Sequence, residues 1–161
     1  MGSASVRYKA AEGKSGRVLV VRLQPGSDLV EGIKQACRDH KIRNGYIGSC
    51  VGGLRQARFL YGVPDKSTKS GTGFSPDVLF VEPTEFIGGE GSICHNEKDE
   101  VLIHFHGFVC DKGHIYGGHF DKPGCLVSTT MEIVIHEVKG VEMTRPLDSE
   151  IDQNHLNPEQ V

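Results

Sequence analysis

Apolar and polar residues alternate along most of this chain with the two-residue period of a half-buried β-strand. Residues 125–138 alternate well, with Met131, Ile133 and Ile135 on one face and Glu132, Val134 and His136 on the other. Residues 101–109 (VLIHFHGFV) are rich in the β-branched and aromatic side chains that suit a half-buried strand. The pattern predicts a protein built mainly of strands. The other predicted strands cover residues 17–23, 46–50, 54–61, 78–81, 85–93, 114–120, 125–138 and 141–144, with a break or kink at Gly52-Gly53 between the second and third.

One segment has a helical period instead. Pro25-Gly26 ends the first strand, and Ser27-Asp28 offers an N-cap with Glu31 in the capping-box position. The apolar residues that follow fall on one helical face, and these are Val30, Ile33, Ala36 and Cys37. We therefore expect one amphipathic helix that packs on the sheet and ends before Asn44-Gly45.

A predicted hairpin carries the candidate chemistry. The turn residues around Lys112-Gly113 separate strand 101–109 from a strand that starts near His114. His104 and His106 lie on one face of the first strand because side chains alternate. If Lys112-Gly113 form a two-residue loop, His106 lies directly opposite His119, with Cβ atoms about 5 Å apart. A three-residue loop would turn His119 to the other face.

Three imidazoles on one face form an open set of metal ligands. Tetrahedral zinc with three protein ligands keeps a fourth position for water or substrate, whereas structural zinc sites close with four. The alternative is that these are ordinary half-buried histidines that hydrogen-bond to carbonyls. Gly117-Gly118 favours the metal, because glycines let a backbone or a ligand approach closely. Cys94-His95 and Cys110 are less favoured extra ligands, since most intracellular cysteines are small buried hydrophobic residues.

Other polar residues bear on whether such a site is catalytic. The sequence offers general acid or base candidates without specifying one, and these are Glu85, Glu90, His114 and Asp121. The polar segment 62–76 is either a lid over the histidines or a disordered loop. The glycine-dense run 88–92 is not a phosphate loop, because no Lys-Ser/Thr follows it. The catalytic residues, if any, stay unassigned at this point.

Composition limits the class of protein. At 161 residues we expect a single domain over 17–147, with a flexible N-terminus (1–16) and a polar C-terminal tail (148–161). The formal charge of −3 argues against a basic nucleic-acid surface. Five cysteines without a C-x-x-C pair predict reduced thiols and a cytoplasmic location. No apolar run is long enough to cross a membrane.

The order of these motifs resembles the plant-and-prokaryote-conserved (PPC) domain family, in its stand-alone prokaryotic form. The resemblance extends over about Arg17 to Leu147 and depends on four motifs. These are the run EFIGGEGSI (85–93), the pair His104-x-His106, the later Gly-Gly-His-Phe (117–120) and the strand with Thr-Met-Glu (130–132). The segment 145–148 (RPLD), which follows the last predicted strand, is also similar to the C-terminal Arg…Asp segment of the family.

The resemblance implies an α+β fold: a compact, mainly antiparallel sheet flanked by one or two helices, usually assembled as a homotrimer. It also implies that His104, His106 and His119 hold a zinc ion. Plant members of the family are DNA-associated regulators with AT-hooks, but this sequence has no Arg-Gly-Arg-Pro segment. Nucleic-acid binding is therefore less well supported by the sequence.

Three hypotheses follow from the sequence. The first is a zinc-binding homotrimeric module that binds a small ligand at the open His₃ site. The second is a zinc-dependent hydrolase or lyase, since a metal with three histidine ligands can activate water. The third is a DNA-associated regulatory protein. The first is preferred, because nothing in the sequence specifies a substrate and the charge disfavours DNA.

Overall fold

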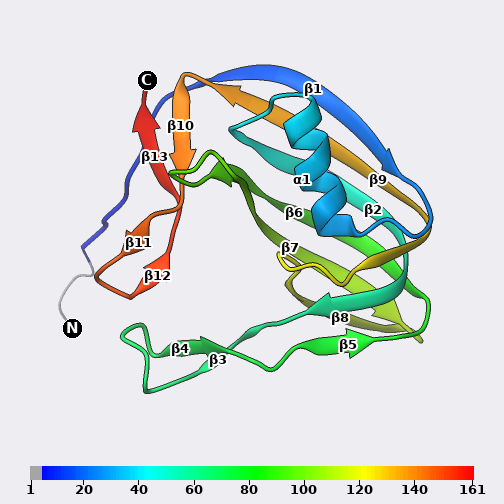
Figure 1. Cartoon of the computed structure of the whole chain (residues 1–161). Helices are drawn as coiled ribbons and strands as arrows, with labels where there is room; N and C mark the ends of the chain where they lie inside the picture. The colour runs from blue at the N-terminus through cyan, green and yellow to red at the C-terminus, as the bar shows by residue number, and fades with distance from the viewer. Residues whose placement is uncertain (1–4) are drawn as a thin grey trace.

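The computed structural model describes residues 5–161 and contains, in that range, one α-helix and thirteen strands (Figure 1). The helix is α1 (Leu29–Asp39). The strands are β1 (Lys14–Leu23), β2 (Gly45–Phe59), β3 (Gly62–Pro64), β4 (Thr72–Phe74), β5 (Val78–Phe80), β6 (Thr84–His95), β7 (Val101–Asp111), β8 (His114–His119), β9 (Leu126–Lys139), β10 (Val141–Thr144), β11 (Leu147–Asp148), β12 (Gln153–Asn154) and β13 (Asn157–Gln160).

Nine of these strands form one sheet. Its main path runs β1-β9-β2-β6-β10-β13, and β6 also pairs with β7, which pairs with β8. All of these pairings are antiparallel except the short contact between β10 and β6. The predicted class, α+β with a mainly antiparallel sheet, is confirmed, with one helix in the described range.

Helix α1 covers one face of this sheet (Figure 1). The predicted N-cap is confirmed, because an Asp28 carboxylate oxygen accepts hydrogen bonds from the backbone N–H groups of Val30 and Glu31. The other carboxylate oxygen of Asp28 accepts the N–H of Gly124, which ties the helix start to the loop before β9. The buried face consists of Leu29, Val30, Ile33 and Cys37.

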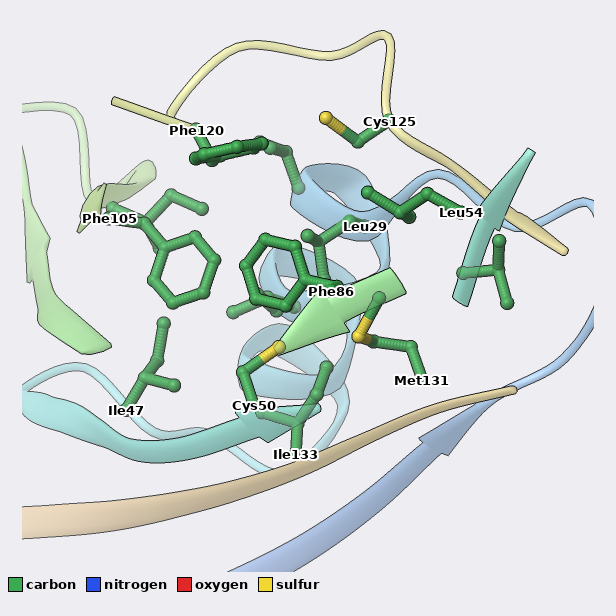
Figure 2. Close-up of a cluster of buried hydrophobic side chains, with 14 of the residues drawn as sticks. Leu29, Ile47, Cys50, Leu54, Phe86, Phe105, Phe120, Cys125, Met131 and Ile133 are labelled. Atoms are coloured by element: carbon green, nitrogen blue, oxygen red, sulfur yellow. The ribbon is translucent and has the colours of Figure 1, made fainter. Parts of the chain in front are cut away.

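The core lies between α1 and the sheet and is rich in aromatic and branched side chains (Figure 2). Phe86 is at its centre. Its ring centroid lies 5.9 Å from that of Phe105 and 5.3 Å from that of Phe120, and all three side chains are fully buried. Strand β9 contributes Met131, Ile133 and Ile135 from one of its faces, all with no exposed surface.

Two predicted segments are more structured than their polarity suggests. Residues 62–76 contain the antiparallel hairpin of β3 and β4, so this segment has regular secondary structure. Residues 148–161 contain strands as well, and β13 pairs with β10 at the edge of the main sheet. The predicted interruption at Gly52-Gly53 is an irregularity inside the single strand β2, so it is a kink and not a break.

The N-terminal boundary also differs slightly from the expected one. Strand β1 begins at Lys14, three residues before the predicted start at Arg17. Within residues 5–161, no helix has the length and apolar character needed to cross a bilayer.

Candidate metal centre

The hairpin of β7 and β8 has the two-residue turn that the prediction required. Lys112 and Gly113 take φ angles of 47° and 84°, between the paired residues Asp111 and His114. This conformation is that of a type I′ turn. The register that follows places His106 directly opposite His119, as predicted.

Three imidazoles converge on the outer face of this hairpin. The ligand-capable nitrogen atoms of His104, His106 and His119 all lie within 4.8 Å of one another. The Nε2 atoms of His104 and His106 are 3.1 Å apart. The ring centroids of His106 and His119 are 4.0 Å apart, and those of His104 and His119 are 5.3 Å apart. We call these residues the histidine triad.

Aromatic anchors on the inner face hold the triad in place. Phe105 lies between His104 and His106 in the sequence, and Phe120 follows His119 directly. Because side chains alternate along a strand, burial of Phe105 turns both neighbouring histidines outward. Phe105 and Phe120 have no exposed surface and both contact Phe86, so the core packing fixes the positions of the strands that carry the triad (Figure 2).

Close neighbours leave no room for a side chain at either of the two glycines before His119. A side chain at Gly118 would overlap the backbone carbonyl oxygen of Leu60. Here His119 and Leu60 form a β-bridge, in which the N–H of His119 donates to the carbonyl of Leu60 at 2.7 Å. At Gly117 an added Cβ would lie 2.7 Å from the Phe108 ring. Gly118 thus allows the close approach of a backbone segment, as expected, whereas Gly117 makes room for the Phe108 side chain.

The electrostatic surroundings favour neutral imidazoles. Burial, followed by the positive charge of Arg145 and the neighbouring histidines, lowers the pKa of His104 to about 4. Burial is also the main reason why the pKa of His119 is lowered. The carboxylate of Asp121 acts in the opposite direction on both pKa values. His104 and His119 thus have free lone pairs at neutral pH, as metal binding requires.

The triad fits a tetrahedral metal ion in ligand type, and its His104–His106 pair also fits in spacing. With Zn–N bonds of 2.0–2.1 Å, two ligands of a tetrahedral zinc ion lie about 3.3 Å apart. The 3.1 Å separation of the His104 and His106 Nε2 atoms is close to this value. Three nitrogen ligands leave one position open, which is the arrangement of catalytic or ligand-binding sites and not of closed structural ones.

The predicted acid or base candidates lie at different positions relative to the triad. Glu90 is directly opposite His106 across β6 and β7, on the triad's face, and Asp121 is close enough to influence His104 and His119. Glu85 pairs with Cys110, four residues along β7 from His106, and His114 is at the far end of the hairpin.

Neither candidate cysteine belongs to the triad. Cys94 is fully buried against Val141 and Met143, and Cys110 lies opposite Ile115. All five cysteines are free thiols.

Two residues near the triad were not predicted. The ring of Phe74, at the end of the β3–β4 hairpin, meets His119 edge-on with centroids 5.0 Å apart. The hairpin is held by Lys69, whose Nζ donates to Asp152 at 2.9 Å. The other residue is Arg145, directly after β10, whose positive charge lowers the pKa values of His104 and His119. Its only sequence signal was its place in the segment similar to the family's C-terminal Arg…Asp motif.

A surface cavity of about 730 Å³ adjoins the C-terminal segment. Its walls come from the β6–β7 turn and from residues after β10, and they include His95, Arg145 and Asn154. The histidine triad does not line it. The histidine triad thus lies outside this cavity, and its ligand set identifies the triad as the functional candidate.

The fold and the triad together define a class of protein with an antiparallel sheet and an open set of histidines. The family model of the Plants and Prokaryotes Conserved (PCC) domain matches residues 10–139. The chain belongs to this family, which is the one its motifs resemble.

Similar proteins carry different descriptions. A structure from Archaeoglobus fulgidus, described as a metal-containing protein, has a TM-score of 0.80 at 23% identity and covers 93% of this chain and 99% of that one. A protein from Ralstonia eutropha, provisionally described as DNA-binding, has a TM-score of 0.69 at 25% identity, with coverage of 86% and 89%.

A relative by sequence is a much longer protein. The bifunctional protein GlmU of Synechococcus sp. (strain JA-3-3Ab) is 32% identical over 146 residues, which is 90% of this chain and 21% of that protein. The chain thus spans about a fifth of the length of this curated relative.

Proposed function

We propose that this chain is a zinc-binding PCC-domain module that binds a small molecule at the open position of its metal. His104, His106 and His119 are the proposed ligands. The observation that carries the proposal is the convergence of three imidazole nitrogens within 4.8 Å, from two adjacent strands whose register is fixed by a two-residue turn.

Zinc is the metal that best suits this ligand set. Neutral imidazoles bind zinc well, and a zinc site with three protein ligands is stable with a fourth position occupied by solvent or ligand. The similarity to a metal-containing protein of the same fold supports a metal at this place. When bound, zinc would supply a Lewis acid, while the chain orients and shields what binds there.

We further propose that the module is a homotrimer in the cytoplasm. The family resemblance supports the trimer, and so does the apolar character of the sheet face opposite α1. Val18 and Val20 on β1 are 57% and 74% exposed, and Tyr46 on β2 is 47% exposed. These side chains are expected to lose exposure when copies associate. Five free thiols support a reducing compartment.

A hydrolase or lyase is the second candidate, because Asp121 lies near the triad. A carboxylate there could accept a proton during catalysis. DNA binding has less support, since the formal charge of −3 opposes contacts with phosphates. The likeness to a segment of GlmU is compatible with either a binding or a catalytic role for the domain.

The direct test is metal analysis of protein purified without added metal. We expect about one zinc ion per chain, and a loss of bound metal in His104→Ala. His155→Ala is the matched control, because His155 is exposed and lies outside the triad, and it should keep its metal. Equal metal content in wild type and His104→Ala would contradict the proposal, and a different metal would correct only the identity of the ion.

A further inference from the structure

We propose that the 730 Å³ cavity beside the C-terminal segment is a second binding site of this protein, for a small molecule that carries a carboxylate or phosphate group. Arg145, in the wall of the cavity, binds this group. The proposal is independent of the metal, because none of the three triad histidines lines the cavity. None of the similarities assigns a role to this place.

The cavity forms where β6 and β10 end side by side. The two strands are parallel here, and Thr144 at the end of β10 pairs with His95 at the end of β6. The residues that follow, Arg145 and Asn96, leave the sheet together, and both line the cavity. The cavity volume of about 730 Å³ is within the range of about 300–1,000 Å³ that is usual for small-molecule sites.

The position of Arg145 is fixed by the C-terminal segment. Its Nη2 donates to the carbonyl oxygen of Asn154 at 2.8 Å, and the Asn154 side-chain amide donates back to the carbonyl of Arg145 at 3.0 Å. Asn154 belongs to β12 and lines the same cavity. This reciprocal pair orders the guanidinium before any ligand binds, which reduces the entropic cost of binding.

Most of the hydrogen-bonding capacity of Arg145 is unused. Among residues 5–161, no carboxylate lies within ion-pair distance of its guanidinium, and only one of its N–H groups has a protein acceptor. The residue is partly buried and lines the cavity, so a solute in the cavity can reach it. A partly buried cation with free donors is suited to bind an anion.

The charges around the cavity differ in how strongly water screens them. The wall contains three basic and three acidic side chains, which are Arg43, Lys98, Arg145, Glu97, Asp99 and Glu159. Arg145 is partly buried, whereas the other five are exposed, and Arg43 and Asp99 form an ion pair with each other. Exposed charges are screened, and a charge in a less polar environment acts more strongly on a ligand. Arg145 is therefore the charge that a ligand in the cavity senses most.

His95 adds a second unused donor to the same wall. Its side chain is only 8% exposed. The Arg43 Nη2 lies 3.0 Å from His95 Nε2, and arginine only donates, so Nε2 accepts and Nδ1 carries the ring proton. The Glu142 Oε2 atom 3.1 Å from Nε2 has no hydrogen-bond partner, as expected if Nε2 is unprotonated. The buried Nδ1 also lacks a partner among residues 5–161, which is uncommon for a buried donor.

Arginine favours oxyanions over other anions for geometric reasons. Its planar guanidinium presents parallel N–H donors that match two oxygens of a carboxylate or phosphate group. Pro146 and Leu147 add apolar surface to the wall, against which the rest of an organic molecule can pack. The ligand class is therefore a small organic acid or a phosphate ester.

The test is an NMR titration of the isotopically labelled full-length protein with two probes, inorganic phosphate and acetate. Sodium chloride keeps the ionic strength constant in every sample, so that general screening does not change. We expect saturable shifts of the backbone amide signals of Asn96, Arg145 and Leu147 with at least one probe. The probe that binds more tightly identifies the preferred group as a phosphate or a carboxylate.

Variants test the role of Arg145 in this binding. Arg145→Gln should bind the preferred probe at least about tenfold more weakly than the wild type does. Arg145→Lys keeps the charge without the fork and should be intermediate. Arg38→Gln also removes an exposed arginine, but on α1 and outside the cavity, and as the matched control it should leave the affinity unchanged.

Three outcomes would overturn the proposal. The first is the absence of saturable shifts in the cavity with both probes. The second is a set of shifts confined to the triad strands, which would place the anion at the metal centre. The third is equal affinity in wild type and Arg145→Gln. If Arg145→Gln fails to fold, as judged by circular dichroism, Arg145→Lys decides, because wild-type affinity in that variant would contradict recognition by the guanidinium fork.

Discussion

His106 and His119 face each other across β7 and β8, with their ring centroids 4.0 Å apart. His119 follows His106 by thirteen positions in the sequence, and a two-residue turn brings them together. A shift of one residue in this pairing would move His119 to the core side of the sheet. The site therefore depends on strand register as much as on the presence of histidines.

Gly118→Ala tests the close approach that supports this register. The added methyl group would overlap the carbonyl oxygen of Leu60, which accepts the N–H of His119. We expect a loss of about 2 kcal/mol in the free energy of unfolding, measured in urea, and weaker metal binding. Gly88→Ala is the control, since a Cβ there meets nothing within 4 Å. Equal stability of the two variants would contradict the close approach.

Phe105→Ala tests the aromatic anchor beneath the triad. Removing this fully buried ring should leave a cavity beside Phe86 and cost about 3–5 kcal/mol in the free energy of unfolding. Phe108→Ala, on the same strand, removes a ring that is 53% exposed and should cost less than about 1 kcal/mol. Denaturant unfolding of the two variants gives the comparison, and similar losses would show that Phe105 does not anchor the strand.

The lowered pKa of His104 predicts how the stability of the metal-free protein depends on pH. The unfolded chain gains a proton at His104 near pH 6.5, whereas the folded chain gains it only near pH 4. Between these values the unfolded state binds more protons, so stability falls as the pH decreases from 6.5 to 4. The cause is burial first and the charge of Arg145 second.

Thermal unfolding of metal-free protein across this pH range checks the prediction. In His104→Gln the decline in melting temperature should become shallower, whereas in His155→Gln it should match the wild type. An NMR titration of His104 should give a midpoint near 4 in the folded protein. A midpoint near 6.5 would show that the site does not disfavour the imidazolium ion.

A second pH effect comes from Glu137 on β9. Its carboxylate accepts hydrogen bonds from the Arg17 side chain at 2.9 and 2.8 Å, and this contact is the main reason its pKa is lowered to about 2. Stability from this pair is complete above the unfolded value of about 4.5 and is lost as the pH falls from there to 2. Glu137→Gln should therefore lose less stability over that range than Glu97→Gln, an exposed control. Parallel acid-unfolding curves would contradict the assigned role of Arg17.

The local elements could be predicted because each depends on short-range patterns. Alternation identified β7 and β9, and Asp28 identified the start of α1, because caps and strand faces are set by neighbouring residues. The pair Lys112-Gly113 suggested the two-residue turn that sets the hairpin register, and the structure confirms it. For that reason the proximity of three histidines could be predicted from one contiguous segment.

Other parts of the site could not be predicted in this way. Polar composition at 62–76 and 148–161 suggested a loop and a tail, but contacts between distant segments order both regions. Lys69 donates to Asp152 across 83 residues, and β13 pairs with β10. Such contacts leave no periodic signal in the sequence, because each partner alone looks like a solvated polar residue.

The sequence by itself determined most strands of the main sheet, the capped helix and the shared face of His104 and His106. It placed His119 on that face only if the turn had two residues, which the structure shows. Only the tertiary structure decided that Phe74 lies beside His119 and that Gly118 makes room for Leu60. The physical reason is that periodicity and turn chemistry act over a few residues, whereas the surroundings of the site come from segments that meet only when the sheet assembles.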